Sequence, residues 1–110
     1  MVAFYQVAKV KRECMGLTQE QFAKIVSVSP SVISRFEMGK DVSELIYKSI
    51  KFNIRLLEDH MNEDERYLYN VVKEARLLSY ENDDKLMQEK LDNVMFACLR
   101  FRKYLTNKNR

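Results

Sequence analysis

Glycine and proline are scarce in this chain of 110 residues, which contains only two glycines and one proline. Sandwiches and barrels need such residues at regular intervals, because tight turns join their many short strands. Apolar residues instead recur at spacings of three and four, as they do along one face of a helix. The sequence therefore predicts an all-α fold.

The composition is typical of a folded chain with a solvated surface. Hydrophobic residues make up 46% of the chain and charged residues 32%, which allows both a buried core and a polar exterior. The 19 basic residues are interspersed with 16 acidic ones, so the net charge of +3 does not by itself indicate a nucleic-acid partner. No apolar run approaches the ~18 residues of a membrane span. We expect a cytoplasmic protein with no membrane partner.

Cysteine and histidine give no sign of metal or catalytic chemistry. Cys14 and Cys98 are far apart, and neither has a His or Cys neighbour at metal-ligand spacing. No nucleophile–base pair and no phosphate-binding loop is visible in the sequence. We expect reduced, buried thiols, no metal, no cofactor and no enzyme activity.

Two short helices are expected near the N-terminus. The first has apolar residues at helical spacing and ends at Gly16; these residues are Val7, Val10, Cys14 and Leu17. The segment Thr18-Gln19-Glu20-Gln21 is a capping-box sequence, in which Thr18 and Gln21 satisfy each other's backbone N–H groups. The second helix starts there, and its inward face would be Phe22, Ala23 and Val26.

A third helix is predicted over residues 30–38, after the interruption Ser27-Val28-Ser29. Ser29 is a favourable N-cap, and Pro30 fits the first helical position because its missing N–H costs nothing there. Ile33 and Phe36 would form the buried face, and Gly39 can adopt the positive φ that ends a helix.

A fourth helix is predicted to begin at Asp41 or Ser43. Asn53 would close it in a left-handed conformation, before a short turn of helix over residues 54–60. The inward-facing side chains of this fourth helix would be Leu45, Ile46, Ser49 and Ile50.

A helical hairpin over roughly residues 62–106 is expected to follow. Asn62-Glu63-Asp64-Glu65 is a polar, acidic helix start, and its helix carries an apolar stripe of Leu68, Val71, Val72, Ala75 and Leu78. Asn82-Asp83-Asp84 repeats the start signal. The last helix has a seam with spacings of four and three, widened on one side, formed by Met87, Leu91, Val94, Met95, Cys98, Leu99, Phe101 and Leu105. We therefore divide the chain into residues 1–61 and 62–110.

Two segments of the N-terminal half carry a family resemblance: Arg12-Glu13-Cys14-Met15-Gly16-Leu17-Thr18-Gln19-Glu20-Gln21-Phe22-Ala23 and Val28-Ser29-Pro30-Ser31-Val32-Ile33-Ser34-Arg35-Phe36-Glu37-Met38-Gly39-Lys40. About residues 7–61 resemble the phage-repressor-like (Cro/CI, XRE-type) helix-turn-helix family. The resemblance implies a domain of about five helices that binds a double-stranded DNA operator by inserting the helix at residues 30–38 into the major groove. Ser27 stands where the family often has glycine, Met38 where a polar residue is common, and Asn53 where glycine usually follows the fourth helix.

The resemblance also implies roles for individual residues. Base edges would be contacted by Pro30, Ser31, Val32, Ser34 and Arg35, and Arg35 suits a bidentate contact with guanine. Phosphates would be contacted by Gln19, Ser29 and Lys40. Arg12 and Glu37 would form a structural ion pair between the first and third helices. The alternative for Arg35 and Lys40 is that both are ordinary solvated side chains.

Two classes of function fit these features. A single recognition helix spans few bases, so the first hypothesis is a homodimeric repressor whose subunits join through the seam beginning at Met87. The same seam could instead only close the hairpin within one chain. The competing hypothesis is a protein-interaction module, similar to an antitoxin or anti-repressor, whose C-terminal helices bind a protein partner.

Overall fold

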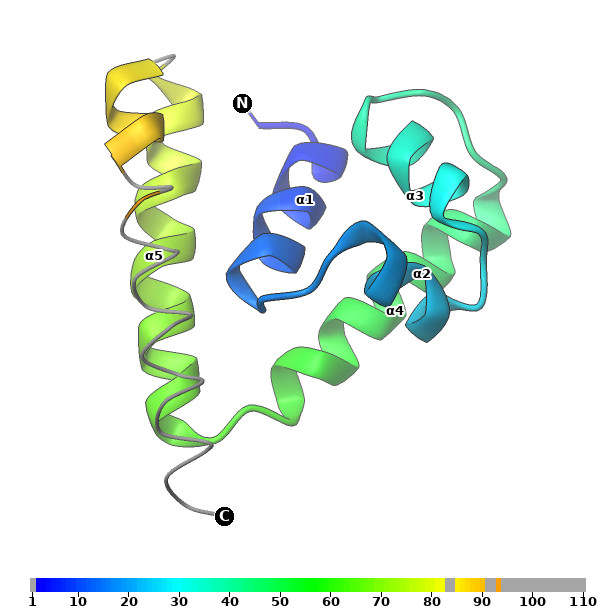
Figure 1. The fold of residues 1–110 in the computed structure, drawn as a ribbon, viewed down its shortest axis with the longest axis horizontal. Coiled ribbons are helices and arrows are strands. Elements are labelled where there is room, and N and C mark those ends of the chain that lie inside the picture. The colour runs from blue at the N-terminus through cyan, green and yellow to red at the C-terminus, as the bar shows by residue number, and fades with distance from the viewer. Residues whose placement is uncertain (1, 83–84, 91–92, 94–110) are drawn as a thin grey trace. The chain divides into compact units, whose positions relative to one another are not determined.

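A computed structural model describes residues 2–82, 85–90 and 93, and these residues form helices joined by loops with no strand among them. The prediction of an all-α fold is confirmed. The helices are α1 (Phe4–Cys14), α2 (Gln19–Val26), α3 (Pro30–Glu37), α4 (Glu44–Asp59) and α5 (Glu63–Glu81), shown in Figure 1. Residues 85–90 are also helical. None of the described helices is both long enough and apolar enough to cross a membrane.

The chain divides into two compact units. The first unit, Val2–Met61, contains α1 to α4, and the second begins at Asn62 and contains α5. The roles expected for residues 1–61 in DNA binding and for 62–110 in dimerisation stay predictions.

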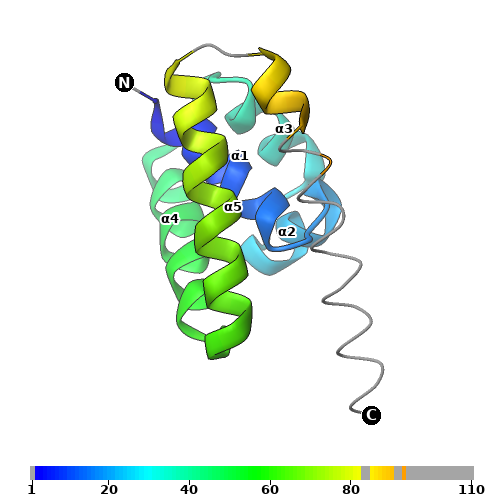
Figure 2. The ribbon, with the colours of Figure 1, turned by 90° about the vertical axis from the view of Figure 1, so that its left-hand side faces the viewer.

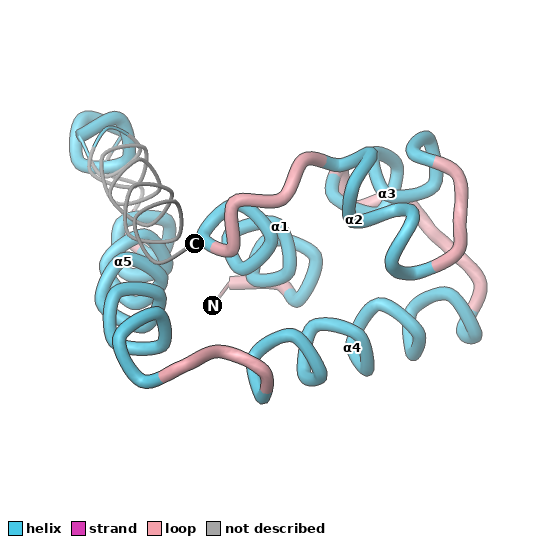
Figure 3. Tube along the Cα trace, turned by 60° about the horizontal axis from the view of Figure 1, so that its bottom comes forward, coloured by secondary structure: helices cyan, strands magenta, loops and turns pink. Residues whose placement is uncertain are grey.

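The core of the first unit is formed where its four helices meet. α2 packs against α3, α1 contacts α3 and α4, and α2 also contacts α4. Figure 3 shows α4 running along one side of the other three helices. The side chains of Phe22, Ile33 and Ile50 are fully buried. The inward faces predicted for α2 and α3 are confirmed, since Phe22, Ala23, Val26, Ile33 and Phe36 are all buried.

Three aromatic rings join α1, α3 and α4. The ring centroids of Phe4 and Tyr47 are 5.0 Å apart, and the Phe36 centroid lies 6.0 Å from that of Phe4 and 6.3 Å from that of Tyr47. The Phe4–Phe36 and Phe36–Tyr47 pairs meet edge to face, an arrangement that aromatic quadrupoles favour. The cluster therefore anchors the C-terminal end of α3 to the first turn of α4.

The capping box predicted at α2 is present. The Thr18 hydroxyl accepts from the Gln21 backbone N–H at 3.0 Å, and the Gln21 side-chain carbonyl accepts from the Thr18 N–H at 2.9 Å. Two N–H groups that the first helical turn leaves without partners are thereby satisfied.

The prediction that Asn53 ends a helix is wrong, because α4 continues without a break from Glu44 to Asp59. The Asn53 side-chain amide donates to the backbone carbonyl of Ser49 at 2.8 Å, which satisfies the side chain inside the helix. Ile54 is 3% exposed, so burial continues past the expected cap. The inward assignment of Leu45 is also wrong, since Leu45 is 78% exposed.

The helix α5 begins as predicted, with the Asn62 side chain accepting from the Glu65 N–H at 2.8 Å, and it forms one continuous helix in Figure 2. The apolar stripe predicted for it is partly wrong. Val71 and Leu78 are 52% and 59% exposed, and the buried positions are Tyr69, Val72, Arg76 and Ser79. The prediction counted aliphatic residues only, whereas Tyr69 and the aliphatic stem of Arg76 also carry apolar area.

Most of the predicted C-terminal seam lies outside the described residues. Within them, Met87 is 46% exposed and Leu86 is 63% exposed. The seam residues outside the described part of the chain are Leu91, Val94, Met95, Cys98, Leu99, Phe101 and Leu105.

Ser27 adopts a left-handed conformation, with φ at 67°, at the C-terminus of α2. An L-residue is strained there by about 1–2 kcal/mol, whereas glycine adopts the same φ freely but costs more chain entropy on folding. We expect Ser27→Gly to raise the free energy of unfolding by about 0.5–1 kcal/mol, measured by urea denaturation. Ser29→Gly is the matched control, because Ser29 has an ordinary φ of −74° and offers no strain to relieve. Equal effects of the two variants, or a loss of stability in Ser27→Gly, would contradict this account.

Candidate nucleic-acid interface

The turn between α2 and α3 contains three residues, Ser27, Val28 and Ser29. After the left-handed Ser27, the N–H of Val28 donates to the carbonyl of Ala23 at 3.0 Å and closes the end of α2. Ser29 is extended, with φ −74° and ψ 153°, and Pro30 then starts α3. Two short helices joined by a turn of this length have the geometry of a helix-turn-helix.

The helix α3 has one buried face and one exposed face. Ile33 and Phe36 are 0% and 4% exposed, and they fix the inward side. On the opposite side, side chains three and four positions apart lie next to one another. Arg35 is exposed and forms no ion pair with any described residue. This exposed face consists of Ser31, Ser34, Arg35 and Met38, with Ser34 half-buried.

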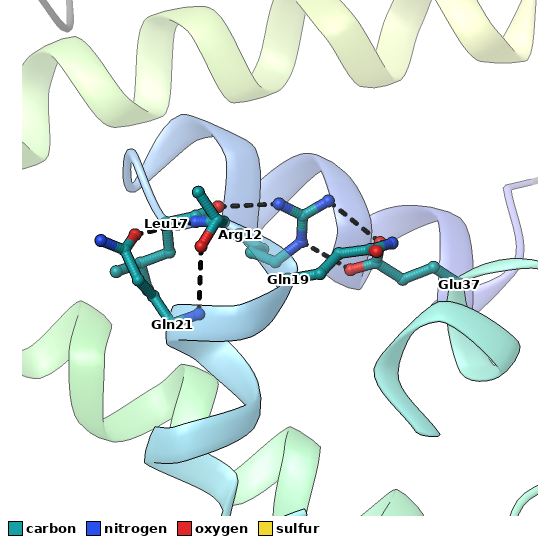
Figure 4. A network of polar contacts seen from close by, with 6 residues as sticks. Arg12, Leu17, Gln19, Gln21 and Glu37 are labelled. Carbon is teal, nitrogen blue, oxygen red and sulfur yellow. Dashed lines mark hydrogen bonds and ion pairs between the residues drawn. The ribbon is translucent and has the colours of Figure 1, made fainter. Parts of the chain in front are cut away.

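The two residues that the resemblance pairs, Arg12 and Glu37, are in contact (Figure 4). The Arg12 Nε donates to Glu37 Oε2 at 2.7 Å, and Arg12 Nη2 donates to Glu37 Oε1 at 3.0 Å. Their side chains are 8% and 4% exposed, respectively. Such a bidentate, charge-assisted pair is both strong and directional, so it holds the end of α3 against α1.

Two further hydrogen bonds complete the network around this pair. The Arg12 Nη1 donates to the backbone carbonyl of Leu17 at 2.7 Å, in the loop before α2. The Gln19 side-chain amide donates to Glu37 Oε1 at 2.9 Å. The network therefore joins α1, the start of α2 and the end of α3.

Gln19 has a contact that the sequence pattern did not indicate. The resemblance assigned Gln19 to a phosphate, whereas its side chain here donates to Glu37. An amide nitrogen carries two hydrogens, so one donor remains beside the N-terminus of α2. The phosphate contact of Gln19 stays a prediction.

The remaining predicted contact residues lie at the two ends of α3. Pro30 and Ser31 are exposed at its start, and Val32 is half-buried. The hydroxyl oxygens of Ser29 and Ser31 are 3.0 Å apart, so Ser29 bonds with Ser31 and does not cap the helix with its side chain. Lys40 is exposed just beyond the C-terminal end of α3.

Two residues at this surface were not selected from the sequence. Met38 is 65% exposed and lies on the same face as Arg35, a position that its spacing along α3 would have revealed. Tyr5 lies against Gly39: a Cβ added at Gly39 would be 2.8 Å from the Tyr5 ring. No local pattern signals the Tyr5 contact, because it joins α1 to a loop more than 30 positions away in the sequence.

A family model described as Helix-turn-helix matches residues 9–46. Residues 9–46 are a helix-turn-helix domain of the phage-repressor (Cro/CI, XRE) type. The match includes α2, the three-residue turn and α3, which are the elements of the geometry described above. No curated protein and no solved structure matches the chain with significant similarity. Domains of this type belong to DNA-binding regulators.

The described part of the chain contains no group of three His, Cys, Asp or Glu residues placed to hold a metal ion. Polar side chains behind α3 form hydrogen bonds within the helix-turn-helix domain, and polar side chains on the opposite side of α3 are exposed. Exposed polar side chains on a helix that is held in place suit contacts with the surface of another molecule.

Removing Glu37 should strongly destabilise the helix-turn-helix domain, because Arg12 would be left buried without its counter-charge. We expect Glu37→Ala to lower the free energy of unfolding by about 3–5 kcal/mol, measured by chemical denaturation. Glu44→Ala is the matched control, since Glu44 pairs with Lys48 at 3.2 Å with both side chains more than two-thirds exposed. The control should lose less than about 1 kcal/mol. Similar losses in the two variants would show that the buried pair has no special role.

Proposed function

We propose that this protein is a homodimeric, sequence-specific DNA-binding regulator that acts as a repressor. In this proposal the exposed face of α3 enters the major groove and reads base edges. A bound dimer would cover its operator and exclude other proteins from that stretch of DNA. The observation that carries the proposal is that α3 has two different sides, with a buried ion pair behind it and exposed polar side chains in front.

Base reading requires a recognition helix that does not rotate or slide. Ile33 and Phe36 fix one side of α3 in the core, and Glu37 ties its C-terminal end to α1 and α2. The exposed Arg35 can then present a planar group with two donors to guanine O6 and N7. Ser31 and Ser34 add short hydroxyls on the same face, and Met38 adds an apolar group that suits a thymine methyl.

Phosphate contacts would flank this face. Lys40 is exposed and forms no ion pair with the residues that the structure describes, so its charge is available to a phosphate. The N-termini of α2 and α3 add partial positive charge near Gln19 and Ser29. These contacts would set the register of α3 without reading sequence.

Dimerisation is the second part of the proposal. Tyr67, Val71 and Leu78 are 70%, 52% and 59% exposed, and they follow one another at helical spacing along α5. Apolar side chains gathered on one face of a helix are unusual on a soluble surface. We propose that the C-terminal unit, including the seam that begins at Met87, is covered by a second copy of this chain.

A protein-interaction module is the alternative, and the same exposed face of α5 favours it. In that case the C-terminal unit would bind an unrelated protein, and binding to DNA would be secondary. The oligomeric state of the purified chain separates the alternatives, since a homodimer covers this face without any partner.

Arg35 should contribute sequence specificity. We expect Arg35→Ala to weaken binding to a duplex selected by the wild-type chain by about 1–3 kcal/mol, and to relax preference at one base pair. Binding would be measured by fluorescence anisotropy on selected and random duplexes. Arg55→Ala is the matched control, because Arg55 is an exposed arginine on α4 outside the predicted contact residues. Equal losses for Arg35→Ala on selected and random DNA would assign Arg35 to the phosphate backbone instead.

Dimerisation should depend on the C-terminal unit. A chain truncated after residue 61 retains the four helices and the core of Val2–Met61, so we expect it to fold and to sediment as a monomer. Its operator binding should be far weaker, because two half-sites are no longer bound by linked domains. Sedimentation velocity of the full-length and truncated chains at equal concentration tests this expectation. A monomeric full-length chain, or a truncated chain that still dimerises, would contradict it.

A further inference from the structure

Tyr5 is packed over the glycine that ends the recognition helix. Gly39 has φ at 81°, and a Cβ built on it would lie 2.8 Å from the Tyr5 ring and 3.1 Å from the Tyr5 hydroxyl oxygen. The contact brings the N-terminal turn of α1 directly against the loop that carries Lys40. A phenol hydroxyl is thereby fixed at the edge of the surface proposed to meet DNA.

The Tyr5 hydroxyl makes no hydrogen bond with any residue that the structure describes. Tyr5 is half-buried, so its ring is held in place while the side chain stays partly open to solvent. Tyr5 and Lys40 also line the same hollow, beside Gly39. The Tyr5 hydroxyl, a neutral donor, and the positively charged Lys40 therefore belong to residues that line one hollow. Neither group forms a hydrogen bond or an ion pair with a described residue.

We propose that Tyr5 and Lys40 together bind one phosphate of the DNA backbone. This inference rests on the proposed function and adds α1 to the elements that would contact DNA. The phenol O–H would donate to a phosphate oxygen, and the ammonium of Lys40 would neutralise the phosphate's charge. Because the ring rests on Gly39, the position of α3 along the groove would be coupled to that phosphate.

Asp41 lines the same hollow and would repel an anion there. The phosphate is therefore expected beside Tyr5 and Lys40 and away from the Asp41 carboxylate. Asp41→Asn removes the repulsion, so we expect this variant to bind DNA more tightly than the wild type. A gain of affinity cannot be attributed to misfolding.

The main test is Tyr5→Phe in the full-length chain, because phenylalanine retains the ring on Gly39 and removes only the hydroxyl. A hydrogen bond to a charged acceptor typically contributes enough that we expect about tenfold weaker binding. The loss should be equal on a selected and a random duplex, since phosphates carry no sequence. Tyr80→Phe is the matched control: Tyr80 is a half-buried tyrosine of α5 that lies outside the exposed face of Tyr67, Val71 and Leu78, and its hydroxyl is not expected to touch DNA.

Salt dependence separates the roles of the two residues. Lys40→Gln should lower the slope of log affinity against log salt by about one, whereas Tyr5→Phe should leave the slope unchanged because the phenol is neutral. If both residues hold one phosphate, the double variant should lose less affinity than the product of the two single losses.

Three results would overturn the inference: wild-type affinity in Tyr5→Phe, a loss confined to the selected duplex, or full independence of Tyr5 and Lys40. If the wild-type chain binds no duplex at all, the proposed function fails and this inference fails with it. Normal wild-type binding with an unaffected Tyr5→Phe variant would overturn this inference alone. Thermal denaturation of Tyr5→Phe, expected to match the wild type, shows that any loss of binding is not a loss of fold.

Discussion

The guanidinium group of Arg12 makes three hydrogen bonds that join separate parts of the N-terminal unit. Two reach the Glu37 carboxylate at the end of α3, and the third reaches the Leu17 carbonyl before α2. Gln19 adds a bond from the start of α2 to the same carboxylate. Two buried charges are costly unless they are paired and hydrogen-bonded, and here each guanidinium nitrogen and each carboxylate oxygen has a partner. The orientation of α3 relative to α1 and α2 depends on this arrangement.

Once α3 is fixed, the division between its two faces follows. Ile33 and Phe36 are buried in the core, and Glu37 belongs to the buried ion pair. The exposed side chains of α3 are polar or flexible. At the C-terminal end of α3, Gly39 allows Tyr5 to approach, and the aromatic cluster of Phe4, Phe36 and Tyr47 holds the adjoining turn of α4. The C-terminal end of α3 is therefore held by several separate contacts, which suits a recognition helix because base contacts depend on register.

Local patterns predicted the local features of this fold. The capping box at Thr18, the start of α3 at Pro30 and the inward faces of α2 and α3 depend on residues within one or two turns, and the sequence contains all of them. Features that depend on tertiary contacts were not predictable in the same way. Asn53 has the propensity to end a helix, yet its amide bonds within α4 and burial of Ile54 continues the helix. The contacts of Gln19 with Glu37 and of Tyr5 with Gly39 join distant segments, so spacing alone could not reveal them.

We propose that the exposed face of α3 is the surface that meets DNA. An NMR titration of the full-length chain, labelled with nitrogen-15, against a duplex selected by the wild-type protein tests this claim most directly. We expect the amide shifts to change most along α3, at the start of α2 and around Lys40, and we expect the changes to disappear as salt is raised. Shifts confined to the outer face of α4 or to α5, with α3 unaffected, would contradict it.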